Sequence, residues 1–289
     1  MQSRNPIFAR SEGFNGRNDA QTYPGNGQQH AGYGDPSQWG TGSPSGPGAP
    51  ATHVDQGRMT IDTVVQKTAI TLGVVVLVAA ATWVFTGDID TQAQLNGLYG
   101  ISLIGAIGGF ALAMVNTFKK VISPGLILVY AVLQGIFVGA FSKALETMFA
   151  NADSSYGGLV VGAVIGTMAA VAGTLAAYKF FDIKVGSRFR TWVIAAGMGF
   201  LAVTLFDMVL GFFGNSLGFN GFGGLGLVMS VIGLGLGVLF LILDFDQVER
   251  GIAAGLPESE SWRAAFGLTA TIVFIYIEIL RILAILRGD

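Results

Sequence analysis

The sequence predicts an all-α, polytopic membrane protein built as a bundle of seven transmembrane helices. Three observations support this prediction: 52% of the 289 residues are hydrophobic, only 12% are charged, and the mean hydropathy is +0.60. An ordinary soluble domain carries about twice that share of charged residues. Because a bilayer span needs roughly 20 mostly apolar residues, the chain after its polar beginning has room for six to eight spans.

The first 57 residues differ in composition from the rest and are predicted to form a disordered cytoplasmic tail. They hold six of the eight prolines, eleven glycines and both histidines. Such a segment cannot bury enough apolar surface to offset the entropy lost on ordering. Three aromatic residues, Tyr23, Tyr33 and Trp39, keep a second interpretation open, in which the tail recruits a partner. Residues 58–289 are predicted to form one transmembrane domain.

Seven apolar runs follow the tail, and each is long enough to cross a bilayer as a helix. In chain order they lie at about 68–86, 98–115, 125–146, 157–178, 191–213, 224–243 and 264–286. Glycines recur four residues apart in several runs, as at Gly105/Gly109, Gly135/Gly139, Gly158/Gly162/Gly166 and Gly233/Gly237. This spacing lets helix backbones approach closely, and we interpret it as tight packing within the bundle rather than dimerisation.

Basic residues in the connections predict the orientation of the bundle. They follow the second, fourth and sixth runs, at Lys119, Lys120, Lys179, Lys184, Arg188, Arg190, Arg250 and Arg263, whereas the other connections hold none. Because cytoplasmic loops carry the excess of Lys and Arg, we expect a cytoplasmic amino terminus, an external carboxyl terminus and a location in the cell membrane. Arg281 and Arg287, near the outer end of the last run, leave open a partly re-entrant span that returns the terminus inside.

The residue inventory excludes several classes of function. The chain has no cysteine, so it cannot form disulfides, thiolate nucleophiles or sulfur-ligated metal sites. His30 and His53 both lie in the tail, so the membrane part lacks the histidines of a haem, a zinc site or a Ser–His dyad. No basic run interleaved with aromatics indicates a nucleic-acid partner. We therefore expect no cofactor and no resident metal.

Acidic residues inside the apolar runs are candidate functional residues, because a charge in a span is costly and is tolerated mainly for use. Four positions fit this description: Asp207, Asp244, Asp246 and Glu278. An aspartyl intramembrane protease would place one aspartate after a Gly-x-Gly and another after a tyrosine, and neither arrangement occurs. We therefore expect that the chain is not an enzyme.

Each acid also has a purely structural interpretation. Asp246, close to Arg250, fits the hydrated inner end of a helix. Glu278 and Arg281 are three residues apart, hence on one helix face, and are placed to neutralise each other. Asp207 has no basic residue within a turn, so both a protonated buried carboxyl and a water-facing carboxylate remain open for it.

Four stretches of the sequence resemble the Bax-inhibitor family of membrane proteins. They are Tyr130 to Gly135 (YAVLQG), Leu243 to Gln247 (LDFDQ), Trp262 to Leu268 (WRAAFGL) and Ile275 to Leu280 (IYIEIL). The resemblance covers roughly residues 58–287 and not the tail. The pattern is most similar to an actinobacterial branch of the family with a long polar amino terminus.

This resemblance implies a seven-helix bundle with its last span near the centre, and a calcium leak gated by a pH-sensitive pair of acids. Carried over by position, the pair is Asp244 and Glu278, the latter replacing the usual aspartate, and Gln134 stands where many relatives carry glutamate. If both spans ran strictly from interface to interface, the two acids would lie about 10 Å or more apart at 1.5 Å per residue. The pairing therefore requires an outward shift of the sixth span, or helices that continue beyond the bilayer.

We predict a membrane protein that mediates a slow, pH-sensitive cation leak, with calcium as the ion. Calcium takes oxygen ligands, and two nearby acids would share a proton and titrate as one unit. Asp244, Glu278 and Asp246 supply few oxygens, so the site would be weak and largely hydrated. The main alternative is an adaptor that transports nothing and holds or modulates partner membrane proteins, such as a quality-control protease. A proton-coupled transporter is a third possibility, against which the lack of an obvious inverted sequence repeat argues.

Overall fold

The computed structural model describes residues 57–288 apart from 120, 150–157, 182 and 184. Seven helices account for most of this part: α1 (Ile61–Phe85), α2 (Gln92–Phe118), α3 (Pro124–Phe149), α4 (Leu159–Phe180), α5 (Ser187–Phe212), α6 (Gly224–Ala253) and α7 (Glu260–Gly288). Each is long and apolar enough to cross a membrane, which confirms the predicted fold class. Of the predicted tail, residues 1–56 lie outside the described residues, so the prediction of disorder stays a prediction.

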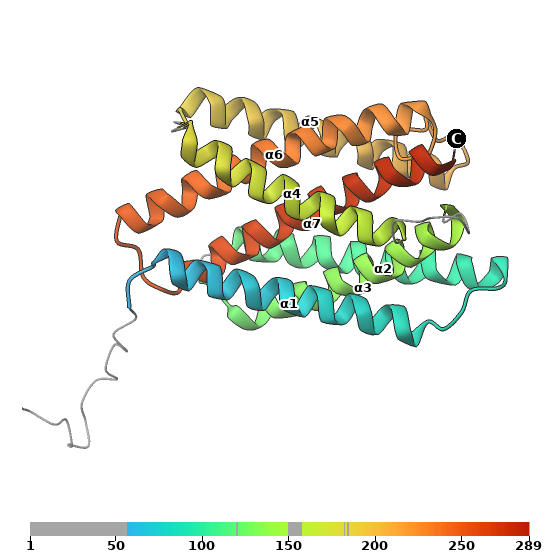
Figure 1. The fold of residues 1–289 in the computed structure, drawn as a ribbon, viewed down its shortest axis with the longest axis horizontal. Helices are drawn as coiled ribbons and strands as arrows, with labels where there is room; N and C mark the ends of the chain where they lie inside the picture. Colours follow the sequence, from blue (N-terminus) through green and yellow to red (C-terminus); the bar gives the residue numbers. More distant parts are fainter. Residues whose placement is uncertain (1–56, 120, 150–157, 182, 184, 289) are drawn as a thin grey trace, which may run out of the picture. The chain divides into compact units, whose positions relative to one another are not determined.

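Helix α7 is the centre of the bundle. It packs closely against α1, α3, α4 and α6, whereas α2 lies against α3, and α5 lies against α6 with a ring contact to α7 between Phe200 and Phe274. Figure 1 shows α7 running between α1 and α4. The central position that the resemblance implied for the last span is therefore confirmed.

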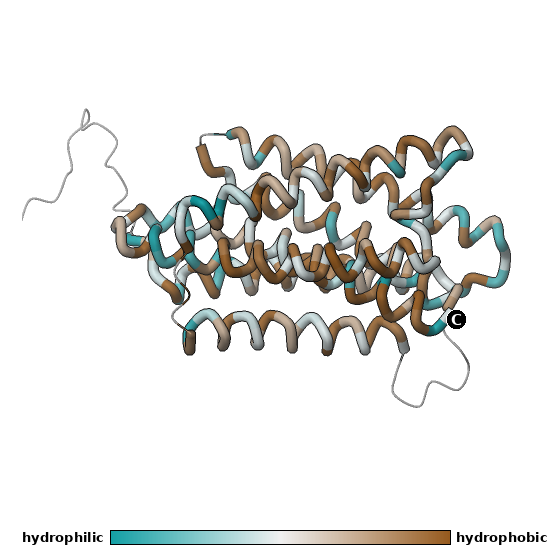
Figure 2. The backbone as a smooth tube through the Cα atoms, turned by 90° about the horizontal axis from the view of Figure 1, so that it is seen from above, coloured by the Kyte–Doolittle hydropathy of each residue, from teal (hydrophilic) through white to brown (hydrophobic). Residues whose placement is uncertain are grey.

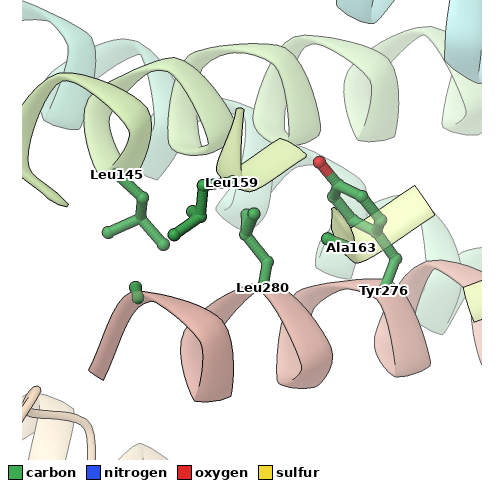
Figure 3. Packing of buried hydrophobic residues seen from close by; sticks show 6 residues of the cluster. Leu145, Leu159, Ala163, Tyr276 and Leu280 are labelled. Carbon is green, nitrogen blue, oxygen red and sulfur yellow. The ribbon is translucent and has the colours of Figure 1, made fainter. Parts of the chain in front are cut away.

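The buried side chains of α7 account for its position. One apolar cluster joins α7 to α3 and α4 through Leu145, Leu159, Ala163, Tyr276, Leu280 and Ala284, and Figure 3 shows their close packing. The outward faces of the bundle are apolar too, as Leu77, Ile104 and Trp192 illustrate, and all three are exposed. In Figure 2 the hydrophilic residues gather toward the ends of the helices and their connections. This distribution suits a bundle that is solvated by hydrocarbon along its sides.

Several helices extend beyond the apolar runs that predicted them. Helix α1 begins at Ile61 because Thr60 and Thr63 form a capping box, each side chain accepting from the other residue's backbone N–H. Helix α6 continues to Ala253, about ten residues past the predicted end at 243. Hydropathy marks only the part of a helix that contacts lipid, so polar turns at helix ends escape it. Helix α7 is one uninterrupted helix over residues 260–288, so the structure gives no support to a re-entrant last span.

The glycine pairs pack helices together within the chain, as predicted. A methyl group at Gly135 would lie 2.7 Å from the Val75 carbonyl oxygen, and one at Gly139 would lie 2.5 Å from the Ala79 carbonyl oxygen. Both contacts are between α3 and α1. Because no side chain separates the two backbones there, dispersion contacts along them can be dense without any hydrophobic driving force.

Candidate functional site

Asp244 lies on the face of α6 that packs against the central helix α7. The Thr271 hydroxyl of α7 donates a hydrogen bond to Asp244 Oδ2 over 2.6 Å. One turn earlier on α7, a methyl at Gly267 would lie 3.5 Å from Asp244 Oδ1, so the carboxylate is close to the α7 backbone. Leu241 and Leu268, one turn from Asp244 and Thr271, are buried in a single apolar cluster. Asp244 is thus a carboxylate held between two helices with one hydroxyl as its hydrogen-bond donor.

Glu278 lies two turns further along α7 in a different setting. It is 4% exposed, and its Oε2 forms an ion pair with Arg281 Nη1 at 3.4 Å. On the α6 side it faces Gly233, where a methyl would lie 2.9 Å from Oε1. The fully buried Ser230, one turn before Gly233, lies beside the same carboxylate. Glu278 and Arg281 therefore neutralise each other inside the bundle, which agrees with the structural interpretation of this pair.

The structure does not bring Asp244 and Glu278 together. The described residues show no hydrogen bond between them, and Thr271, the partner of Asp244, precedes Glu278 by seven residues. Seven residues of α-helix correspond to a rise of about 10 Å. The register follows from small residues on α6, because Gly233 faces Glu278 and Gly237 faces Ile275. The position opposite Asp244, which the resemblance assigned to a second acid, is occupied by a threonine.

Two charged residues hold the connection between α5 and α6. Asp207 is 1% exposed and accepts from the backbone N–H groups of Leu217 (2.6 Å) and Asn220 (2.8 Å) and from the Ser216 hydroxyl (3.0 Å). From α7, Arg281 Nη2 donates to the Phe219 carbonyl over 3.1 Å. Asp207 is therefore buried, as one interpretation of the sequence expected, and does not face open water, as the other expected. It organises a loop whose backbone donors cannot be read from sequence.

Asp246 belongs to a polar cluster between α4 and α6. Arg250 Nε lies 2.8 Å from Asp246 Oδ2, and Arg250 Nη2 donates to the Val185 carbonyl over 2.6 Å. Tyr178 of α4 donates to Glu249 Oε2 over 2.7 Å. These residues line a polar cavity of about 420 Å³. This arrangement fits the interpretation of Asp246 as part of a hydrated helix end, and it turns Asp246 away from α7.

Gln134 lies on α3 and is not part of the Asp244 site. Its Nε2 donates to the Tyr130 hydroxyl over 2.9 Å, and its Oε1 would lie 3.3 Å from a methyl at Gly109 of α2. Both residues line a small cavity of about 200 Å³ between α2 and α3. No described hydrogen bond or ion pair links Gln134 to an acid on α6 or α7.

Two charged residues that sequence analysis missed cap neighbouring helices from α3. Lys143 donates to the Trp83 carbonyl (2.8 Å), the Thr86 hydroxyl (2.9 Å) and the Gly87 carbonyl at the end of α1. Glu146 accepts from Leu159 N (3.1 Å) and Val160 N (3.0 Å) at the beginning of α4. A cation at a helix carboxyl end and an anion at an amino end complement the helix dipoles. Lys143 lies within the apolar run at 125–146, and Glu146 lies at its end. A charge in an apolar run is thus the sequence signal that could have identified both residues.

The residues Gly57 to Thr60, here called the strap, cover the turn between α6 and α7. Met59 N donates to the Leu256 carbonyl over 2.8 Å, and Glu258 N donates to the Gly57 carbonyl over 2.6 Å. The Met59 side chain is 4% exposed and joins the apolar cluster that contains Leu241 and Leu268. The strap therefore lies against the same part of the bundle as Asp244. It escaped the sequence analysis because it sits at the boundary of the polar tail.

A cation at Asp244 would find few protein ligands. The local side-chain oxygens are those of one carboxylate and one hydroxyl, whereas Ca²⁺ takes 6–8 oxygen ligands. Within the described residues, no group of three or more His, Asp and Glu side chains is arranged to hold a metal ion. The geometry therefore does not suit tight binding of calcium.

Comparison with known protein families gives a match that covers most of the chain. A family model described as Bax inhibitor 1 like matches residues 5–288. No curated protein sequence matches the chain. The match confirms the family that the four sequence stretches indicated. It also corrects the extent of the resemblance, which begins at residue 5 and not near residue 58, and so includes most of the predicted tail.

Proposed function

Because this chain belongs to the Bax inhibitor 1 like family, we propose that it mediates a slow, pH-sensitive leak of cations, with calcium as the ion. The observation that supports this proposal most directly is the position of Asp244 between α6 and the central helix α7. A carboxylate there has one hydroxyl partner and no described cation beside it. An acid without a compensating cation is costly inside a membrane, and its presence there therefore supports a functional role.

The pH sensitivity is proposed to come from Asp244 and Thr271 rather than from two acids sharing a proton. When ionised, Asp244 accepts the Thr271 hydroxyl and attracts a passing cation. When protonated, it loses that attraction. Cation flux should therefore fall as the pH is lowered through the titration of this carboxyl. Glu278 has a lesser part in this scheme because Arg281 already neutralises it.

Calcium flux into liposomes that contain only the purified chain tests the proposal. The wild type should carry a leak above protein-free liposomes, and Asp244→Asn should reduce it while folding normally. Asp207→Asn is a poor control because it disrupts a loop, so Gln134→Leu, which removes a polar side chain between α2 and α3, serves as the control. A wild-type protein that is folded and silent would refute the leak.

The alternative function is an adaptor for other membrane proteins. It is favoured by α5, which lies against α6 with one ring contact to α7 and exposes large apolar residues such as Trp192, Met198 and Phe206. A helix with so much free apolar surface can contact lipid or another transmembrane helix. A silent wild type in the flux assay would favour this function.

We further propose that the chain has no catalytic activity and that it resides in the cell membrane with a cytoplasmic amino terminus. The first proposal is supported by the lack of cysteine in the chain and of histidine outside residues 1–57. The second is supported by the Lys and Arg residues that lie in or beside the α2–α3, α4–α5 and α6–α7 connections.

A further inference from the structure

An apolar groove lies between α1 and α4, away from the acids on α6 and α7. Its cavity volume is about 450 Å³. Helices α1 and α4 do not pack against each other within the described residues, and both flank α7, as Figure 1 shows. Side chains of α3 and α7, among them Val138, Gly139 and Val273, form the floor.

The groove has few polar groups that could bind water. Its lining is aliphatic apart from Trp83 and three hydroxyl-bearing residues. Ser142 and Tyr276 hydrogen-bond to each other over 2.8 Å, and Thr167 donates to the Ala163 carbonyl over 2.7 Å. Water needs two to four polar partners to occupy a cavity, and these groups are already paired. The groove is therefore a place for hydrocarbon.

Its position matches one leaflet of a bilayer. On α1 the lining runs from Leu72 to Val84, which is close to the end of that helix at Phe85. On α4 it runs from Val160 to Met168, at the beginning of that helix. Twelve residues of helix rise about 18 Å, and one leaflet contributes about 15 Å of hydrocarbon. The groove thus extends from near mid-membrane to the side where α1 ends and α4 begins.

The outer end of the groove has the features of a membrane interface. Trp83 lines it there, and Lys143 Nζ lies 5.7 Å from the centre of the Trp83 ring. Tryptophan is enriched at the headgroup level because its ring is amphipathic. An acyl chain that enters from this side would thus have its headgroup near Trp83.

We propose that this groove is a lipid site, occupied by one acyl chain of a phospholipid from the leaflet on the side where α1 ends. The flanking spans expose apolar residues on either side of the groove, such as Leu77 and Ile165, so it is continuous with the surface that faces the bilayer. A resident chain would fill the gap between α1 and α4 and contact α7 at Ile272, Val273 and Tyr276.

Photo-crosslinking in liposomes tests this proposal. The full-length protein is reconstituted with a phosphatidylcholine that carries a diazirine near the end of one acyl chain, and labelled peptides are mapped by mass spectrometry. Because the headgroup would lie near Trp83, labels should concentrate at the mid-membrane end of the groove, on residues 72–76 and 164–168. Ala80→Phe and Val164→Phe place bulk at exposed groove positions and should each reduce this labelling severalfold.

Leu77→Phe and Ile165→Phe are the matched controls, since both residues are exposed on the same helices but do not line the groove. They should label like the wild type. If one groove variant fails to fold, the other decides. Unchanged labelling of a folded groove variant, labels spread evenly over α2 and α5, or crosslinks to a second copy at the groove would overturn the proposal.

Discussion

At the scale of the residue, partners decide what each buried charge does. Asp207 has loop donors, Glu278 has Arg281, and Asp244 has only the Thr271 hydroxyl. All three were candidates from sequence because charge in a span is rare. The sequence could not rank them, since a partner such as Leu217 N is a backbone group that only the folded loop supplies. Among the described residues, Asp244 is the one of the three with a single hydrogen-bond donor and no cation beside it.

The Glu278–Arg281 pair should matter for stability rather than for flux. Removing either partner leaves a buried charge unpaired, so Glu278→Gln and Arg281→Gln should each destabilise the fold by about 3 kcal/mol. The double variant should recover much of that loss, because no charge is then stranded. Thermal unfolding in detergent measures all three. A double variant as unstable as the sum of the singles would contradict this account.

At the scale of the element, the sequence located all seven helices but not their register. Apolar runs predict that a span exists, because length and hydropathy are properties of the chain alone. The contact between Gly233 and Glu278 depends on how α6 meets α7, and it placed Thr271 rather than Glu278 opposite Asp244. The carboxyl end of α6 beyond residue 243 and the strap lie outside the apolar runs for a similar reason, because tertiary contacts hold them.

Close packing of α3 on α1 predicts a sharp difference between two glycines. A methyl at Gly139 meets the Ala79 backbone, whereas one at Gly73 of α1 meets nothing within 4 Å. Gly139→Ala should destabilise the protein by about 1–3 kcal/mol through overpacking, and Gly73→Ala should be neutral or slightly stabilising. Thermal unfolding of both variants is the check. Equal stability of the two would argue against tight α1–α3 packing.

At the scale of the whole molecule, the strap is the part of the chain that links the predicted tail to the first helix of the bundle. The predicted tail ended at residue 57, yet the Gly57 carbonyl already accepts a hydrogen bond from Glu258 N. Met59, two residues later, is buried under the end of α6. The part of the chain that contacts the bundle therefore includes Gly57, which the sequence analysis assigned to the tail.

Two truncations should separate the tail from the strap. Deletion of residues 1–56 should leave folding and detergent stability unchanged, since the strap survives. Deletion of residues 1–60 removes Met59 and the Thr60 cap, and should lower stability by about 2 kcal/mol or more. Expression level and thermal unfolding report both. Loss of folding on the shorter deletion would mean that residues 1–56 also contact the bundle.

The orientation of the bundle can be tested with single cysteines, because the chain has none of its own. Arg188 and Asp88 are both exposed, in connections predicted to face opposite sides. An impermeant thiol reagent applied to intact cells should label Asp88→Cys and spare Arg188→Cys. The reverse pattern would invert the predicted topology.

The central claim is that a single acid, Asp244 with Thr271, confers the pH response. Its most direct test is calcium flux into liposomes from pH 5 to pH 8 for the wild type, Asp244→Asn and Glu278→Gln. Asp244→Asn removes the titrating charge and should give low flux with a flat pH profile. Folded Glu278→Gln should keep the wild-type profile, because its partner is Arg281. A wild-type profile in Asp244→Asn, or a flat one in Glu278→Gln, would contradict the account.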